Sequence, residues 1–185
     1  MKTQQNIIRR LTLAAGLVMA LSSAHAQLRT WTGGGTNDFW STAANWSGTA
    51  PGATGATLIF DGNTRLGPNN DIVTSLNGIT FAASAGSFVL GGNTFILNGN
   101  ITNNSGVLQT IDNAMTLNGQ RNIDAAQGDI RISGAIGETG GVRVLAKMGT
   151  ETLTLAGANT FTGQLNFLQG KILLDAGAGG SLAAG

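Results

Sequence analysis

The chain has 185 residues, of which 42% are hydrophobic and 10% are charged, and its formal net charge is +1 at pH 7. This low charge density, with no basic run along the chain, excludes a nucleic-acid-binding protein. The chain has no cysteine and one histidine, which excludes disulfide-stapled folds and zinc sites built from Cys and His.

The first 26 residues have the organisation of a secretory signal peptide. Lys2, Arg9 and Arg10 precede an apolar stretch at 11–21, and small residues lead to a cleavage position after Ala26. The apolar stretch is shorter than the roughly 20 residues of a membrane-spanning helix, which argues against the alternative of a membrane anchor. We therefore expect export, cleavage after Ala26, a secreted or cell-surface location, and no membrane span in the mature chain.

Removal of this segment changes the chemistry that remains. It takes away 3 of the 10 basic residues, so 7 basic and 9 acidic residues remain and the net charge becomes −2. The one histidine, His25, leaves with it. Without His or Cys, the mature chain lacks the parts of Ser-His-Asp and Cys-His catalytic groups. We therefore expect no enzyme, no catalytic residue, no metal and no cofactor in this chain.

Two acidic features bear on that expectation. Asp124 and Asp129 flank Gly128, and carboxylate pairs serve some polysaccharide-cleaving β-helices, but Asp beside a turn more often forms the turn. The run from Asp61 to Ile72 contains oxygen ligands but lacks the sixth-position glycine and twelfth-position glutamate of an EF-hand. Neither feature predicts a site.

The region at 27–71 differs from the rest and contains all three tryptophans of the chain, Trp31, Trp40 and Trp46. A solenoid needs an atypical end unit to cover the apolar surface and strand edges of its first turn. We therefore expect 27–71 to be an N-terminal cap with the tryptophans as its local core. The alternative is a carbohydrate-stacking platform formed by Trp31, Trp40 and Trp46, because exposed indole rings pack against sugar rings.

A short pattern of two apolar residues flanking one residue, followed shortly by glycine, recurs within 72–185. It occurs at 95–99, 115–119, 130–134 and 153–157, and its glycines are 20, 15 and 23 residues apart, about 19 on average. A period near 20 is typical of a solenoid, and the alternation predicts short strands with one buried face. We expect an all-β fold, a right-handed parallel β-helix (β-solenoid) over 72–185 with the Trp-rich cap at its N-terminal end. The irregular spacing leaves a β-sandwich as the alternative.

The most specific motif lies at about 147–175. It reads K-M-G at 147–149, T-L-T-L-A-G-A-N-T-F-T-G at 152–163 and G-K-I-L-L-D at 170–175. This closely resembles the autotransporter-associated β-strand repeat, also called the passenger-associated transport repeat, whose core reads T-L-T-L-S-G-A-N-T-Y-T-G. Ala156 stands in place of Ser, Phe161 in place of Tyr, and Q-L-N at 164–166 in place of the usual G-T-T. The resemblance implies a β-helical passenger segment of an exported surface protein, with no catalytic residues in the repeat.

These observations predict a secreted or cell-surface structural or adhesive passenger scaffold of an autotransporter-like protein, non-catalytic in this segment. The expected partners are a host surface or an extracellular polysaccharide, and neighbouring β-helix coils of a longer chain. The second of these follows because the repeat pattern is interrupted at Gly185, which predicts a fragment. The alternative is a secreted carbohydrate-binding or polysaccharide-degrading β-helix protein.

Overall fold

The computed structural model describes residues 27–183, and the predicted signal peptide at 1–26 lies outside the described residues. Within 27–183 the chain is almost entirely strand and turn, with two single-turn 3-10 helices. In chain order the elements are β1 (Gln27–Trp31), η1 (Ala43–Asn45), β2 (Ala56–Phe60), β3 (Asn69–Asn70), β4 (Ser75–Phe81), β5 (Val89–Gly92), β6 (Phe95–Asn103), β7 (Gln109–Ile111), β8 (Met115–Leu117), β9 (Arg121–Ala125), β10 (Ile130–Ile132), β11 (Ile136–Glu138), β12 (Leu145–Met148), β13 (Thr152–Leu155), β14 (Leu165–Phe167), β15 (Lys171–Leu174) and η2 (Ala176–Ala178).

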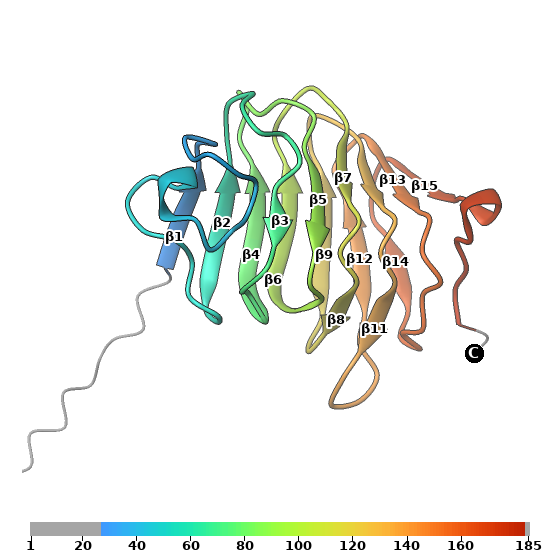
Figure 1. Cartoon of the computed structure of the whole chain (residues 1–185). Coiled ribbons are helices and arrows are strands. Elements are labelled where there is room, and N and C mark those ends of the chain that lie inside the picture. The colour runs from blue at the N-terminus through green and yellow to red at the C-terminus, as the bar shows by residue number, and fades with distance from the viewer. Residues whose placement is uncertain (1–26, 184–185) are drawn as a thin grey trace, which may run out of the picture.

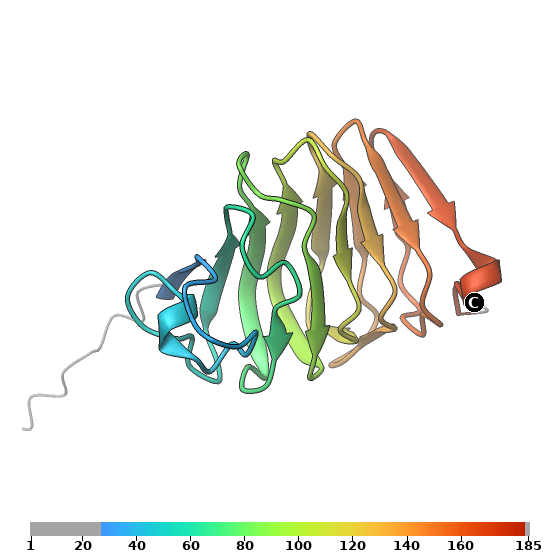
Figure 2. The ribbon, with the colours of Figure 1, turned by 45° about the horizontal axis from the view of Figure 1, so that its top comes forward.

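The strands form a nine-stranded sheet and a six-stranded sheet that face each other (Figures 1 and 2). The larger sheet runs β1-β2-β4-β6-β9-β12-β14, with β8 and β11 beside this path, and the smaller runs β3-β5-β7-β10-β13-β15. The paired strands of both sheets run parallel, and the chain alternates between the sheets as it advances. This confirms the predicted parallel β-helix. The β-sandwich alternative is wrong, because sandwiches are built from antiparallel sheets.

Residues in register recur once per turn of the solenoid. Ile79, Ile101, Ile123 and Lys147 occupy one column of the larger sheet and are 22, 22 and 24 residues apart. The sequence average of about 19 is shorter than a full turn. It is shortened by the spacing of 15, which joins glycines that follow β8 and β10 and therefore compares two different sheets within one turn.

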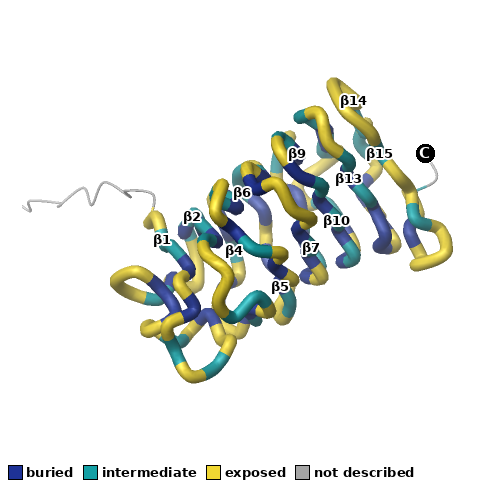
Figure 3. The backbone as a smooth tube through the Cα atoms, turned by 90° about the horizontal axis from the view of Figure 1, so that it is seen from above, coloured by how far each residue is buried: buried dark blue, intermediate teal, exposed yellow. Residues whose placement is uncertain are grey.

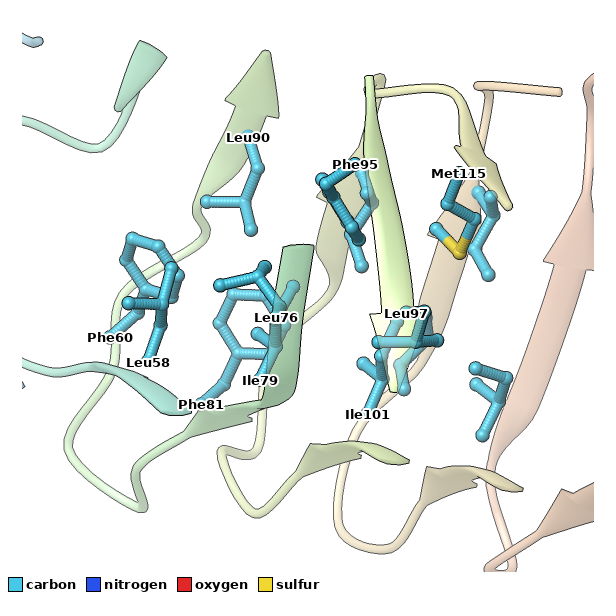
Figure 4. Packing of buried hydrophobic residues seen from close by; sticks show 14 of the residues in the cluster. Leu58, Phe60, Leu76, Ile79, Phe81, Leu90, Phe95, Leu97, Ile101 and Met115 are labelled. Atoms are coloured by element: carbon cyan, nitrogen blue, oxygen red, sulfur yellow. The ribbon is translucent and has the colours of Figure 1, made fainter. Parts of the chain in front are cut away.

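The core lies between the two sheets and follows the alternation along each strand. In β10, Ile130 and Ile132 are fully buried while Arg131 between them faces outward, and most interior strands repeat this pattern. Figure 4 shows the apolar side chains of successive turns, such as Leu97 and Ile101, gathered in the space between the ribbons. Burying this surface contributes about 25 cal/mol per Å², and each interior turn covers the apolar face of the turn before it.

Glycine at the corner after the smaller sheet allows successive turns to approach closely. A Cβ atom at Gly134 would collide with the carbonyl oxygen of Asn113 one turn earlier, and a Cβ atom at Gly157 would collide with that of Gly134. Two of the four glycines in the recurring sequence pattern are therefore required by backbone contact between turns.

The two ends of the solenoid differ. At the N-terminal end a loop region containing η1 lies against β1 and β3, while β1 and β2 themselves pair into the larger sheet although they fall within 27–71. At the other end β14 and β15 are the last strands of their sheets. Figure 3 shows the last turn as mostly exposed, whereas the strands of the middle turns are mostly buried.

Candidate functional site

The three tryptophans form the core of the N-terminal cap. Trp31 and Trp40 are completely buried and Trp46 is 4% exposed. Trp46 packs edge-on against both, with ring centroids 5.1 Å from Trp31 and 6.3 Å from Trp40, and all three rings lie about 6 Å from Phe60. The Trp46 indole N–H donates to the carbonyl oxygen of Trp40 at 2.8 Å.

This burial overturns the carbohydrate-stacking alternative for Trp31, Trp40 and Trp46. Stacking requires an exposed ring face, and these rings are covered by one another and by the first turn of the solenoid. Their role in the described structure is to close the N-terminal end of the core, as expected for a cap core.

Asn45 holds the loops of the cap together. Its buried side-chain amide donates to the carbonyl oxygens of Asn37 and Phe39 at 2.9 and 3.0 Å, and its carbonyl oxygen accepts from the Gly35 N–H at 2.8 Å. These contacts account for the polar capacity of a buried amide, so this residue is structural and offers nothing to a ligand.

An open hollow of about 360 Å³ lies beside the cap. It is lined by Thr30, Trp31, Thr32, Asp61, Gly62 and Ser84. The Asp61 carboxylate accepts from the Ser84 hydroxyl and from the Gly62 N–H at 2.7 Å, which fixes the carboxylate at the rim. The hollow is thus polar and hydroxyl-rich, and Asp61 is its one ionisable lining group.

The described carboxylates brace turns and do not gather into a catalytic or metal-binding cluster. Asp129 accepts from the Thr152 N–H of the next turn at 2.8 Å, which is the turn-forming role expected for the Asp124 and Asp129 pair. Glu138 accepts from Thr162 and from the Arg143 N–H, and these hydrogen bonds, that of the Thr162 hydroxyl above all, lower the pKa of Glu138. Within 27–183, no group of three or more Asp and Glu side chains is arranged to hold a metal ion.

Lys147 is a charged residue in the core. It lies in the inward-facing column of Ile101 and Ile123, is completely buried, and donates from Nζ to the carbonyl oxygens of Met148, Gly149 and Gln169 at 2.6, 2.8 and 3.1 Å. The burial lowers the pKa of Lys147, and the nearby carboxylates of Asp124, Glu151 and Asp129 oppose that shift. The sequence singled out Lys147 only as the first residue of the repeat motif, since a lysine signals an exposed position.

The last turn presents apolar side chains that the other turns bury. Leu174 is 46% exposed and Phe167 is 58% exposed, whereas Leu155 and Lys147, their partners one turn earlier, are fully buried. In the described residues β14 pairs only with β12 and β15 only with β13, so each has a free edge. We call the surface formed by β14 and β15 the open end.

Comparison with known proteins adds no family or function to this geometry. No protein-family model, no curated protein and no solved structure matches the chain. Within 27–183, none of the helices combines the length and the hydropathy of a membrane span.

Proposed function

We propose that the chain is an exported structural scaffold, a β-solenoid passenger segment of an autotransporter-like surface protein without catalytic activity in this segment. The observation that carries the proposal is the open end, whose inward-facing side chains continue the buried columns of the core and whose strands have free edges. Such a surface is built to be extended by further coils, because each turn of a solenoid covers the one before it.

The organisation of the rest of the chain supports a scaffold role. The carboxylates of Asp129 and Glu138 and the ammonium of Lys147 are all engaged in hydrogen bonds that join one turn to the next or close a turn. The cap closes one end and the sheets present long polar outer faces, which suits a secreted or cell-surface protein that displays a surface to a host or to an extracellular polysaccharide.

Export is tested by expressing the full 185-residue chain in a bacterial host and determining the N-terminus of the product outside the cytoplasm by mass spectrometry. We expect a product that begins at Gln27. The control carries Leu17→Arg and Val18→Arg, which interrupt the apolar stretch and should retain the precursor in the cytoplasm. A native chain that stays in the cytoplasm with residues 1–26 attached would overturn the proposal.

A second candidate function is carbohydrate binding, and the hollow beside the cap favours it. Hydroxyl and carboxylate groups from Thr30, Thr32, Ser84 and Asp61 line a space large enough for one or two sugar units, and Trp31 borders it. A bound oligosaccharide should therefore change the tryptophan fluorescence of the native chain, and Asp61→Ala should remove the change while Asp112→Ala should not. Fluorescence indifferent to a panel of oligosaccharides would reject this function.

A further inference from the structure

The open end has a symmetric pattern of side chains. On β15, Lys171 and Asp175 are two residues on either side of Leu173, and Ile172 and Leu174 are one residue on either side. Since side chains alternate along a strand, Lys171, Leu173 and Asp175 face outward, and Ile172 and Leu174 face the core, in register with buried Leu153 and Leu155.

An antiparallel copy of this strand is therefore complementary to it. If β15 pairs with β15 of a second chain about Leu173, Lys171 lies opposite Asp175 of the second chain, and Ile172 lies opposite Leu174. Opposite charges then meet on the outer face and apolar side chains meet on the core face, and both kinds of cross-strand pair are favourable. Asp175 already forms an ion pair with Arg131 at 2.9 Å, so it would lie between two cations.

The neighbouring strand β14 has the same property. It contains Leu165, Asn166 and Phe167, so antiparallel pairing about Asn166 places Leu165 opposite Phe167 of the second chain on the core face. The two asparagine side chains then meet on the outer face, where each amide can both donate and accept.

One two-fold axis can serve both strands. Asn166 lies three residues before Gln169 and Leu173 lies three residues after Gly170, and these two residues connect β14 to β15. Because strands rise about 3.3 Å per residue, equal numbers of residues from the connection place both centres at nearly the same height. A rotation about an axis through both centres returns the core face of each sheet to the core side.

The N-terminal end cannot take part in such pairing. The Thr32 N–H donates to the carbonyl oxygen of Asn45 at 2.7 Å, the Ser47 N–H to that of Thr30 at 2.8 Å, and the Trp40 N–H to that of Asn69 at 2.9 Å. The cap loops thus occupy backbone groups of β1 and β3 and cover the core with the tryptophans. Head-to-tail growth into a fibre is blocked, and association through the open end closes at two chains.

We propose that the open end is a self-association surface, and that two copies of this chain join through it in a closed, two-fold symmetric dimer with β14 and β15 each paired antiparallel to their copies. The dimer deepens the scaffold function and rests on it, because it gives the scaffold two outward-facing caps. The two proposals are tested separately, since export does not depend on pairing at the open end.

The chain contains no cysteine, so single cysteines report on contacts without interference. Leu173→Cys and Asn166→Cys each place a thiol on the proposed axis, and both variants should form covalent dimers under mild oxidation or with a short bismaleimide. The control is Val142→Cys, at a loop position that is 68% exposed and far along the chain from β14 and β15, and it should remain monomeric. Cross-linking of the control alone, or of neither axis variant, would overturn the proposal.

Sedimentation equilibrium of the purified native chain gives an independent measurement. We expect a species of twice the chain mass, and Lys171→Glu should raise its dissociation constant at least about tenfold, because the introduced carboxylate would face Asp175 of the second chain. Val142→Glu, which adds a carboxylate away from the open end, should leave the constant unchanged. A monomer at all accessible concentrations, or larger assemblies in place of a dimer, would refute the closed dimer.

Discussion

Arg131 on β10 forms an ion pair with Asp175 at the end of β15, with 2.9 Å between the Arg131 Nη1 and the Asp175 Oδ2, although β13 lies between the two strands. The guanidinium therefore reaches over one whole turn and ties the last turn of the solenoid to the turn two before it. The hydrogen bond from Arg131 is the main reason that the pKa of Asp175 is lowered.

Loss of this ion pair should loosen the last turn without unfolding the protein. Asp175→Asn keeps an oxygen that can accept from the Ala178 N–H and removes the charge that Arg131 binds. Because the pair is partly exposed, hydrogen exchange at 171–175 should quicken by no more than about fivefold, while the melting temperature of the chain stays the same. Faster exchange in the middle turns as well would show that the pair supports the whole solenoid.

Glu138 should make the stability of the solenoid fall in acid. Its folded-state pKa is lowered, chiefly by the Thr162 hydroxyl, so its contribution is fully present above the unfolded-state pKa of about 4.3 and is lost as the pH falls through the folded-state pKa. Glu138→Gln should therefore lower the urea midpoint at pH 7, and the difference from the native chain should shrink as the medium is acidified below that unfolded-state pKa. Glu151→Gln is the control, because its carboxylate accepts only from the Thr150 side chain in the described structure.

The cap should contribute strongly to stability through its tryptophans. Trp46→Ala removes a buried ring that touches Trp31, Trp40 and Phe60, and should cost about 3–5 kcal/mol of the free energy of unfolding. Phe39→Ala, in the same loop region but 46% exposed, should cost much less. Urea titration checks both variants, and equal effects would contradict the assignment of the tryptophans as the cap core.

The fold was largely predictable because its main signal is local. The triplets at 95–97, 115–117, 130–132 and 153–155 lie on β6, β8, β10 and β13, each with its middle residue facing outward, as alternation requires. The length of a turn was less predictable, since two strands of one turn carry the same short pattern. The burial of the tryptophans agrees with the cap-core interpretation, which rests on the need to cover a solenoid end.

The role of Lys147 could not be predicted from the sequence. Val142 to Leu145 was the expected strand, whereas β12 begins at Leu145 and extends to Met148, which places Lys147 on the core face. Its acceptors come from the corner that follows and from Gln169, 22 residues later, and no local pattern connects them. The free edges of β14 and β15 were equally hidden, since pairing of a strand is a property of its neighbours in space.

The corner after β10 should not tolerate a side chain. Gly134→Ala would force a methyl group against the carbonyl oxygen of Asn113, and the shift of one turn away from the next should cost about 1–3 kcal/mol. Gly106→Ala is the matched control, because a Cβ atom there meets no neighbouring atom within 4 Å. Denaturant unfolding of both variants measures the difference, and a harmless Gly134→Ala would mean that the turns are not in close contact at this corner.

The buried ammonium of Lys147 should stabilise the corner by its three hydrogen bonds. Lys147→Met keeps most of the apolar stem but leaves the carbonyl oxygens of Met148, Gly149 and Gln169 without this donor, so the free energy of unfolding should fall by about 1–3 kcal/mol. Lys171→Met, at an exposed position, should change it by no more than about 0.5 kcal/mol. Urea unfolding distinguishes the two. If Lys147→Met were as stable as the native chain, the cost of burying the charge would equal the gain from its hydrogen bonds, and the lysine would be a neutral replacement for the isoleucine found in the preceding turns.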